Sequence, residues 1–160
     1  MLDMFFNPKG VAVIGASADR GKLGNQVLAN LIESGYKGGL YPINPKATEI
    51  LGLKCYSSVL DVPQGIDLVV IVVPNKFVAG VLEESGKKGA KGAIVITAGF
   101  REAGGEGVKM EQDLLAIAQK YQMRIIGPNC LGLIDTGAPL NASFAAGTPQ
   151  AGSIAFMSQS

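Results

Sequence analysis

The chain has 160 residues, 48% of them hydrophobic, with 22 glycines and a formal net charge of +1, which suits one folded α/β domain with a sizeable core. The small net charge and the lack of a basic run argue against nucleic acid as a partner. No apolar stretch approaches the roughly 20 residues that cross a bilayer, and the N-terminus lacks a signal-peptide pattern, so we expect a cytoplasmic protein without a membrane partner.

Buried strands alternate with helices along the chain. Residues 11–14 form the first expected strand, followed by a glycine-rich segment and an amphipathic helix that begins near Gly24 and stops at Gly35. Further strands are expected at residues 39–43, 68–73, 93–96 and 124–126. The run 68–73 is aliphatic without alternation, which is typical of a strand covered on both faces inside a parallel sheet.

Five strands joined by long crossovers predict an α/β fold, a Rossmann-like doubly wound parallel sheet with helices on both faces. By analogy with dinucleotide-binding folds we expect the strand order 3-2-1-4-5. Ligands of such sheets bind beyond the carboxyl ends of the strands, where the order reverses. The segments that directly follow the strands, here called the strand exits, are therefore expected to line the site; they are residues 15–24, 44–46, 73–76, 97–100 and 128–131.

The last part of the chain has a different character. Residues 131–134 have the composition of a short strand, whereas residues 135–152 are rich in Gly, Ala and Pro and have no helical period. Residues 152–157 look like the start of a new strand before the closing Ser-Gln-Ser. We therefore assign residues 1–150 to one ligand-binding domain and residues 151–160 to the beginning of a second domain. Earlier in the chain, residues 101–107 are expected to form a mobile loop with a solvated Glu102.

The first strand exit is typical of a phosphate cradle. Gly15, Gly21 and Gly24 let the backbone approach a ligand, and free N–H groups at the helix start face an anion. Since the helix dipole contributes only about 0.3 to 1 kcal/mol per charge, the side chains of the loop have to supply most of the affinity. Three of its side chains suit that task, namely Ser17, Arg20 and Lys22. Gly15 and Gly24 also suit tight strand–helix packing.

Two common phosphate-binding motifs do not match this exit. The NAD fingerprint needs G-x-G-x-x-G and an acidic residue after the second strand, but this chain has Asn44, Pro45 and Lys46 there. A lysine instead suits an extra phosphate on the ribose, as in NADP or coenzyme A (CoA). The nucleoside triphosphatase loop fails as well, because Ala16 takes the place of its first glycine and Leu23 the place of its Ser or Thr.

The residue inventory limits the chemistry inside the chain. It contains no histidine and only two cysteines, Cys55 and Cys130. This excludes Ser–His and Cys–His catalysis within these residues, and it argues against a disulfide framework or a metal site. Both thiols are expected to be small buried side chains, and we assign no catalytic residue.

Seven short motifs occur in an order that matches one known family. They are residues 13–17 (VIGAS), 22–24 (KLG), 41–46 (YPINPK), 72–74 (VVP), 97–100 (TAGF), 126–132 (IGPNCLG) and 158–160 (SQS). Each is weak alone, but together they resemble the CoA-binding domain of ADP-forming acyl-CoA (acetyl-CoA) synthetases, a family related to the α subunit of succinyl-CoA synthetase. The resemblance covers essentially the whole chain.

The resemblance implies a role in the reaction acyl-CoA + ADP + phosphate ⇌ carboxylate + CoA + ATP. In that family a phosphohistidine carries the phosphoryl group, and it must lie outside this chain because the chain has no histidine. ADP, ATP and Mg²⁺ are bound by other parts of the enzyme, and the implied partner is an ATP-grasp domain or a β subunit. The chain alone is then expected to bind CoA without turnover.

The resemblance also implies roles for particular residues. The nucleotide part of CoA lies on the loop from Ser17 to Leu23, the 3′-phosphate lies near Lys46, and Ser158 and Ser160 bind phosphate in the intact enzyme. Val73 and Pro74 flank the adenine or the pantetheine arm, and the later exits lie toward the thioester. The full set of expected CoA-binding residues is Gly15, Ser17, Asp19, Arg20, Lys22, Leu23, Gly24, Asn44, Lys46, Val73, Pro74, Thr97, Ala98, Asn129 and Cys130.

Two other functions stay open on sequence alone. One is a stand-alone or regulatory CoA-binding module, such as the silent copies of this domain fused to acetyltransferases. The other is an NADP-binding domain of an oxidoreductase, because Lys46 suits a 2′-phosphate as well as a 3′-phosphate.

Overall fold

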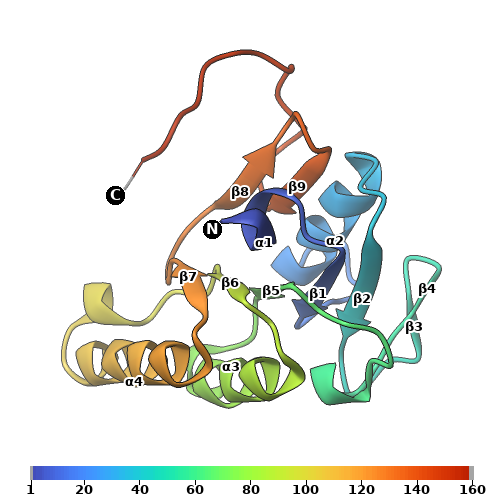
Figure 1. Cartoon of the computed structure of the whole chain (residues 1–160). Helices are drawn as coiled ribbons and strands as arrows, with labels where there is room; N and C mark the ends of the chain where they lie inside the picture. Colours follow the sequence, from blue (N-terminus) through green and yellow to red (C-terminus); the bar gives the residue numbers. More distant parts are fainter. Residues whose placement is uncertain (1, 159–160) are drawn as a thin grey trace.

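A five-stranded parallel sheet forms the centre of the molecule (Figure 1). The computed structural model describes residues 2–158. The strands of the sheet are β1 (Gly10–Ile14), β2 (Gly39–Ile43), β5 (Leu68–Ile71), β6 (Gly92–Val95) and β7 (Arg124–Ile126), in the order β2-β1-β5-β6-β7. All four pairings are parallel, which confirms the predicted doubly wound α/β fold.

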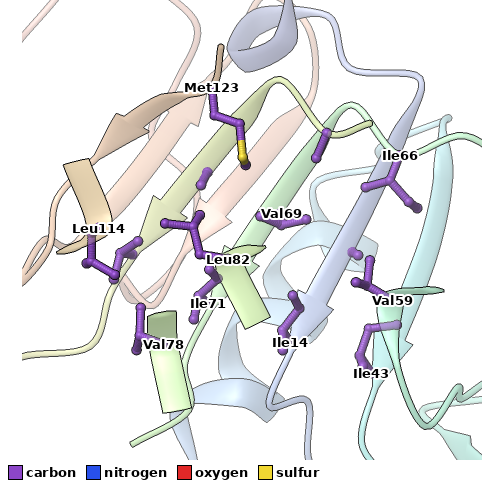
Figure 2. Close-up of a cluster of buried hydrophobic side chains, with 14 of the residues drawn as sticks. Ile14, Ile43, Val59, Ile66, Val69, Ile71, Val78, Leu82, Leu114 and Met123 are labelled. Carbon is purple, nitrogen blue, oxygen red and sulfur yellow. The ribbon is translucent and has the colours of Figure 1, made fainter. Parts of the chain in front are cut away.

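Helices cover both faces of this sheet and divide the core into two apolar layers. Helix α2 (Leu23–Glu33) packs on one face, and α3 (Asn75–Lys88) and α4 (Glu106–Tyr121) lie side by side on the other (Figure 1). Successive strand residues point to opposite faces, so Val69 belongs to the layer beneath α3 and α4, which Figure 2 shows, whereas Val70 belongs to the α2 layer. This two-sided burial explains why β5 has no hydrophobic alternation.

The predicted strand order 3-2-1-4-5 is wrong. The third main strand, β5, pairs with β1 from Val11↔Leu68 onward instead of lying beyond β2, so the order is 2-1-3-4-5. Every residue of β5 is buried and needs covered surroundings, whereas three residues of β2 are only half-buried and its Pro42 cannot donate a backbone hydrogen bond. Proline is confined to edge strands for that reason, and β2 is the edge.

The segment between β2 and β5 covers the edge of the sheet. It forms a small hairpin of β3 (Glu49–Ile50) and β4 (Leu53–Lys54), and then the 3-10 turn η1 (Val59–Asp61). A parallel bridge between Ile43 and Tyr56 extends the sheet by one residue pair beyond β2.

A second hairpin packs on α2. It consists of β8 (Gly132–Asp135) and β9 (Leu140–Ser143), and the side chain of Asn30 donates from Nδ2 to the backbone oxygens of Ser143 (2.8 Å) and Ala145 (2.9 Å). The short strand expected at residues 131–134 is confirmed as β8, whereas β9 was not expected. The remaining short elements are α1 (Asp3–Phe6) and η2 (Arg101–Ala103).

The strand expected at residues 152–157 is not formed in the described part of the chain. Ile154, Phe156 and Met157 are 93%, 90% and 97% exposed, and the segment has no neighbouring strand with which to pair. None of the helices within residues 2–158 is long and apolar enough to cross a membrane.

Candidate ligand-binding site

The exits of β1, β2 and β5 meet at one edge of the sheet. The N–H of Gly15 donates to the oxygen of Ile43 (3.0 Å), and the N–H of Val72 donates to the oxygen of Ile14 (2.9 Å). The strand order reverses here, because the chain leaves β1 toward β2 and then returns to the other side of β1. Ligands of doubly wound sheets bind at this position, so we take these exits as the candidate site.

The first exit is a tight turn that brings α2 against the sheet. Gly15 has φ +94°, a conformation that suits glycine, and a Cβ on Gly24 would lie 2.0 Å from the backbone oxygen of Gly15. Lys22 stands before the helix and makes no side-chain cap. The first N–H groups of α2, those of Leu23 and Gly24, have no acceptor within the helix and are suited to an anion.

Side chains within the loop hold its shape. The N–H of Asp19 donates to Ser17 Oγ (3.1 Å), and the N–H of Gly21 donates to Asp19 Oδ1 (2.9 Å). Ser17 and Asp19, both expected to bind CoA, therefore already have partners inside the loop. Arg20 and Lys22 are exposed and form no ion pair with any residue between 2 and 158, so both cations are available to an anionic ligand.

The β2 exit is joined directly to this loop. Asn44 donates from Nδ2 to the backbone oxygen of Ala16 (2.8 Å), and its Oδ1 accepts the N–H of Lys46 (2.9 Å). Lys46 is exposed, and its ammonium group also lacks an acidic partner within the described residues. The second strand exit thus carries a lysine whose backbone is joined through Asn44 to the first strand exit.

The exits of β5, β6 and β7 continue along the same edge. Thr97 donates from Oγ1 to the oxygen of Val73 (2.7 Å), and the N–H of Asn129 donates to the oxygen of Thr97 (3.0 Å). Pro74 and Ala98 are exposed between them. The hydrogen bonds therefore connect the exits into one continuous edge that runs from Lys46 to Asn129.

Cys130 is half-buried at the β7 exit. Its Sγ approaches the oxygen of Val95 (3.4 Å), and burial raises the pKa of its thiol. A thiol whose pKa is raised has little reactive thiolate at neutral pH. Of the two thiols that the sequence predicted to be buried, Cys55 is buried and Cys130 is only half-buried.

Ser158 is exposed in a segment without regular structure, and Ser160 lies outside the described residues. Their expected roles as phosphate ligands stay predictions.

The structure adds Asn25 and Glu102 to the residues found from the sequence. Asn25, in the first turn of α2, is 5% exposed and donates from Nδ2 to the oxygen of Ser17 (2.8 Å). The carboxylate of Glu102 accepts the N–H groups of Gly99 (2.5 Å) and Phe100 (3.2 Å) in the β6 exit. A polar residue on the buried face of a predicted helix was the available signal for Asn25.

A hollow in the described part of the chain lies elsewhere. It has a volume of about 560 Å³ and runs between α4 and the outer edge of β7, with Leu114, Met123 and Pro128 among its lining residues. It contains none of the glycine turn or the free cations Arg20, Lys22 and Lys46. The polar groups that suit a phosphate ligand gather at the strand exits, and we place the site there.

Comparisons with known proteins point to one family. The family model described as a CoA binding domain matches residues 9–136. Subunit alpha of the ADP-forming acetate–CoA ligase II of Pyrococcus furiosus is 54% identical over 100% of this chain and 35% of the relative. The ADP-forming acetate–CoA ligase I of Archaeoglobus fulgidus is 50% identical over 99% of this chain and 23% of the relative.

A solved structure agrees with these sequence relatives. The dinucleotide forming acetyl-coenzyme A synthetase 1 of Candidatus Korarchaeum cryptofilum, in complex with phosphate and ADP, superposes with a TM-score of 0.88. It is 48% identical over 91% of this chain and 31% of that chain. The chain thus spans about a third or less of the length of these relatives. The family model covers most of the sequence, and the fold of the chain matches that of the solved synthetase. The chain therefore belongs to the CoA binding domain family.

Proposed function

We propose that the chain binds CoA at the exits of β1, β2 and β5 and forms the CoA-binding part of an ADP-forming acyl-CoA synthetase. One observation carries this proposal: Lys46 stands at the second strand exit, tied through Asn44 to the glycine turn of the first exit. NAD-binding folds have an acidic residue at that exit for the ribose hydroxyls, whereas a lysine suits a ribose that carries a phosphate.

The residues of the edge fit the parts of CoA in order. Lys46 pairs with the 3′-phosphate, and Arg20, Lys22 and the first N–H groups of α2 hold the diphosphate. The absence of a Cβ at Gly24 allows the helix start to reach this position. Val73 and Pro74 then lie beside the adenine or the pantetheine arm, and the thioester end points toward the β6 and β7 exits.

In the proposed enzyme, phosphate attacks the thioester carbon of acyl-CoA and the C–S bond breaks. CoA departs as the thiolate, and an acyl phosphate is formed. A histidine outside this chain then accepts the phosphoryl group from the acyl phosphate, and the carboxylate is released. The phosphohistidine transfers the phosphoryl group to ADP to give ATP. The residues of this chain hold the leaving CoA and take no covalent part. We assign nucleotide, Mg²⁺ and an ATP-grasp domain or β subunit to parts of the enzyme outside this chain, which spans only 35% and 23% of two relatives. A cytoplasmic location stays a prediction.

Titration calorimetry on the 160-residue chain tests the ligand. We expect binding of CoA, weaker binding of dephospho-CoA, which lacks the 3′-phosphate, and little binding of NADP. Strong binding of NADP with none of CoA would overturn the proposal and favour an oxidoreductase domain.

A further inference from the structure

Two asparagines hold two successive carbonyl groups in the loop between β1 and α2, residues 15–22, which we call the phosphate loop. Asn44, from the β2 exit, donates from Nδ2 to the oxygen of Ala16 at 2.8 Å. Asn25, from the first turn of α2, donates from Nδ2 to the oxygen of Ser17, also at 2.8 Å. The loop is therefore held from both of its neighbours by the same kind of hydrogen bond.

Holding a carbonyl group also fixes the direction of an N–H group. A trans peptide unit is planar, and its C=O and N–H point in opposite directions. The oxygen of Ala16 shares its peptide unit with the N–H of Ser17, and the oxygen of Ser17 shares its unit with the N–H of Ala18. Since both carbonyl groups point at protein side chains, the N–H groups of Ser17 and Ala18 are directed away from Asn44 and Asn25.

These two N–H groups are free to bind a ligand. Within residues 2–158, neither the N–H of Ser17 nor that of Ala18 has a hydrogen-bond acceptor. Ala18 is exposed and Ser17 is half-buried, so an anion can reach both. Adjacent backbone N–H groups that lack protein acceptors can bind phosphate oxygens.

Asn44 has a second contact that Asn25 lacks. Its Oδ1 accepts the N–H of Lys46 at 2.9 Å, so one side-chain amide joins the phosphate loop to the backbone of the lysine. An asparagine amide provides both a donor and an acceptor, which this double contact requires. Asn44 thereby fixes where Lys46 stands relative to the N–H groups of the loop.

We propose that Asn25 and Asn44 are positioning residues for CoA: they aim the N–H groups of Ser17 and Ala18 at the diphosphate, and Asn44 also sets Lys46 against the 3′-phosphate. This inference rests on the proposed function. It assigns the two asparagines an effect on ligand affinity without a contact to the ligand.

The variants Asn25→Ala and Asn44→Ala test the two parts separately by calorimetry on the 160-residue chain. Asn25→Ala weakens CoA and dephospho-CoA by the same factor, about tenfold, and keeps the preference for CoA. Asn44→Ala weakens both and also reduces the preference for CoA, because Lys46 loses its anchor. Asn30→Ala is the matched control, since Asn30 also donates to backbone carbonyls but does so at the β8–β9 hairpin, and both affinities stay within about twofold of wild type.

A residue with only a structural role would lower the melting temperature and leave the affinities for CoA and dephospho-CoA unchanged. Variants at positions 25 and 44 that bind both ligands as Asn30→Ala does would overturn the inference. An unchanged preference for CoA in Asn44→Ala would overturn the part that concerns Lys46.

Amide NMR of the ¹⁵N-labelled wild-type chain provides a readout that needs no variant. On saturation with CoA or dephospho-CoA the amide protons of Ser17 and Ala18 shift downfield, while that of Asn30 stays in place. Unchanged Ser17 and Ala18 resonances in a chain that binds CoA would overturn the inference alone. A wild-type chain that binds neither ligand would overturn the proposed function, and the inference with it.

Discussion

Gly24 lies against Gly15 so closely that a Cβ at position 24 would stand 2.0 Å from the backbone oxygen of Gly15. A backbone atom cannot turn aside as the tip of a side chain can, so Gly24→Ala must displace the start of α2. We expect a loss of about 1–3 kcal/mol in the free energy of unfolding and weaker CoA binding. Urea unfolding and calorimetry measure the two effects.

Gly80→Ala is the control for that variant. Gly80 also lies in a helix, α3, but it is exposed and a Cβ there meets nothing within 4 Å. Replacing a helical glycine with alanine then stabilises the fold by about 0.5–1 kcal/mol, with no change in CoA affinity. If Gly24→Ala behaved like Gly80→Ala, the close contact with Gly15 would not matter for stability or for the site.

Lys46→Ala tests the contact with the 3′-phosphate. Loss of a charge-assisted hydrogen bond weakens CoA binding by roughly 1.5–3 kcal/mol, and dephospho-CoA binding barely changes because the phosphate is absent. Lys109→Ala is the control, since it removes an exposed lysine of α4, which lies on the face of the sheet opposite to α2. We expect it to change the affinity for neither ligand. Equal losses for CoA and dephospho-CoA in Lys46→Ala would contradict this assignment.

The carboxylate of Glu102 stabilises the β6 exit, and this stabilisation is expected to be lost at acid pH. The N–H groups of Gly99 and Phe100 donate to its carboxylate, and the bond from Gly99 is the main cause that holds the pKa of Glu102 below its ordinary 4.5. The stabilisation is present above the pKa of the unfolded chain and is lost as the pH falls through the lower folded-state pKa. We expect Glu102→Gln to lose less stability than wild type between neutral and acid pH, as measured by urea midpoints. Parallel curves for the two proteins would show that Glu102 is not the group responsible.

Tyr36 has the opposite dependence at alkaline pH. Burial, with a smaller effect of Asp67, raises the pKa of its phenol from 10.0 to about 12, and the neutral hydroxyl donates to the oxygen of Pro8 (2.6 Å). The contribution of Tyr36 to the free energy of unfolding is complete below pH 10 and is lost as the pH rises toward 12. Tyr36→Phe is expected to flatten this alkaline loss. An ultraviolet titration in which all four tyrosines ionise together near their ordinary pKa would contradict it.

The strands could be predicted from their composition, but their order and the second hairpin could not. An aliphatic run marks a buried strand wherever it lies in the sheet, and the signal for the edge was the single Pro42 of β2. Strand β9 carries Asn141 and Ser143, polar residues that are typical of loops. Both are fully buried because the Ser143 hydroxyl donates to Asn141 Oδ1 (2.6 Å) and the Asn141 amide donates to the oxygen of Gly147 (3.2 Å). Such long-range satisfaction of polar groups is not visible in local sequence.

The site was predictable to a similar extent. Gly15, Gly24 and Lys46 lie in the expected strand exits 15–24 and 44–46, so their place at the edge followed from the fold class. Asn25 was missed because a polar residue in a first helical turn is common, although it shares a buried face with Leu28. Glu102 is exposed as expected, but its hydrogen bonds to the β6 exit depend on a turn conformation that the sequence pattern does not reveal.

The division of the core into two layers has a practical consequence for engineering. Neighbouring residues of β5 belong to different layers, so a mutant library at Val69, Val78 and Leu82 changes the packing beneath α3 and leaves the layer of α2 intact (Figure 2). Directed evolution for heat tolerance can therefore begin in the α3–α4 half of the molecule, while the helix that starts at the phosphate loop keeps its native support.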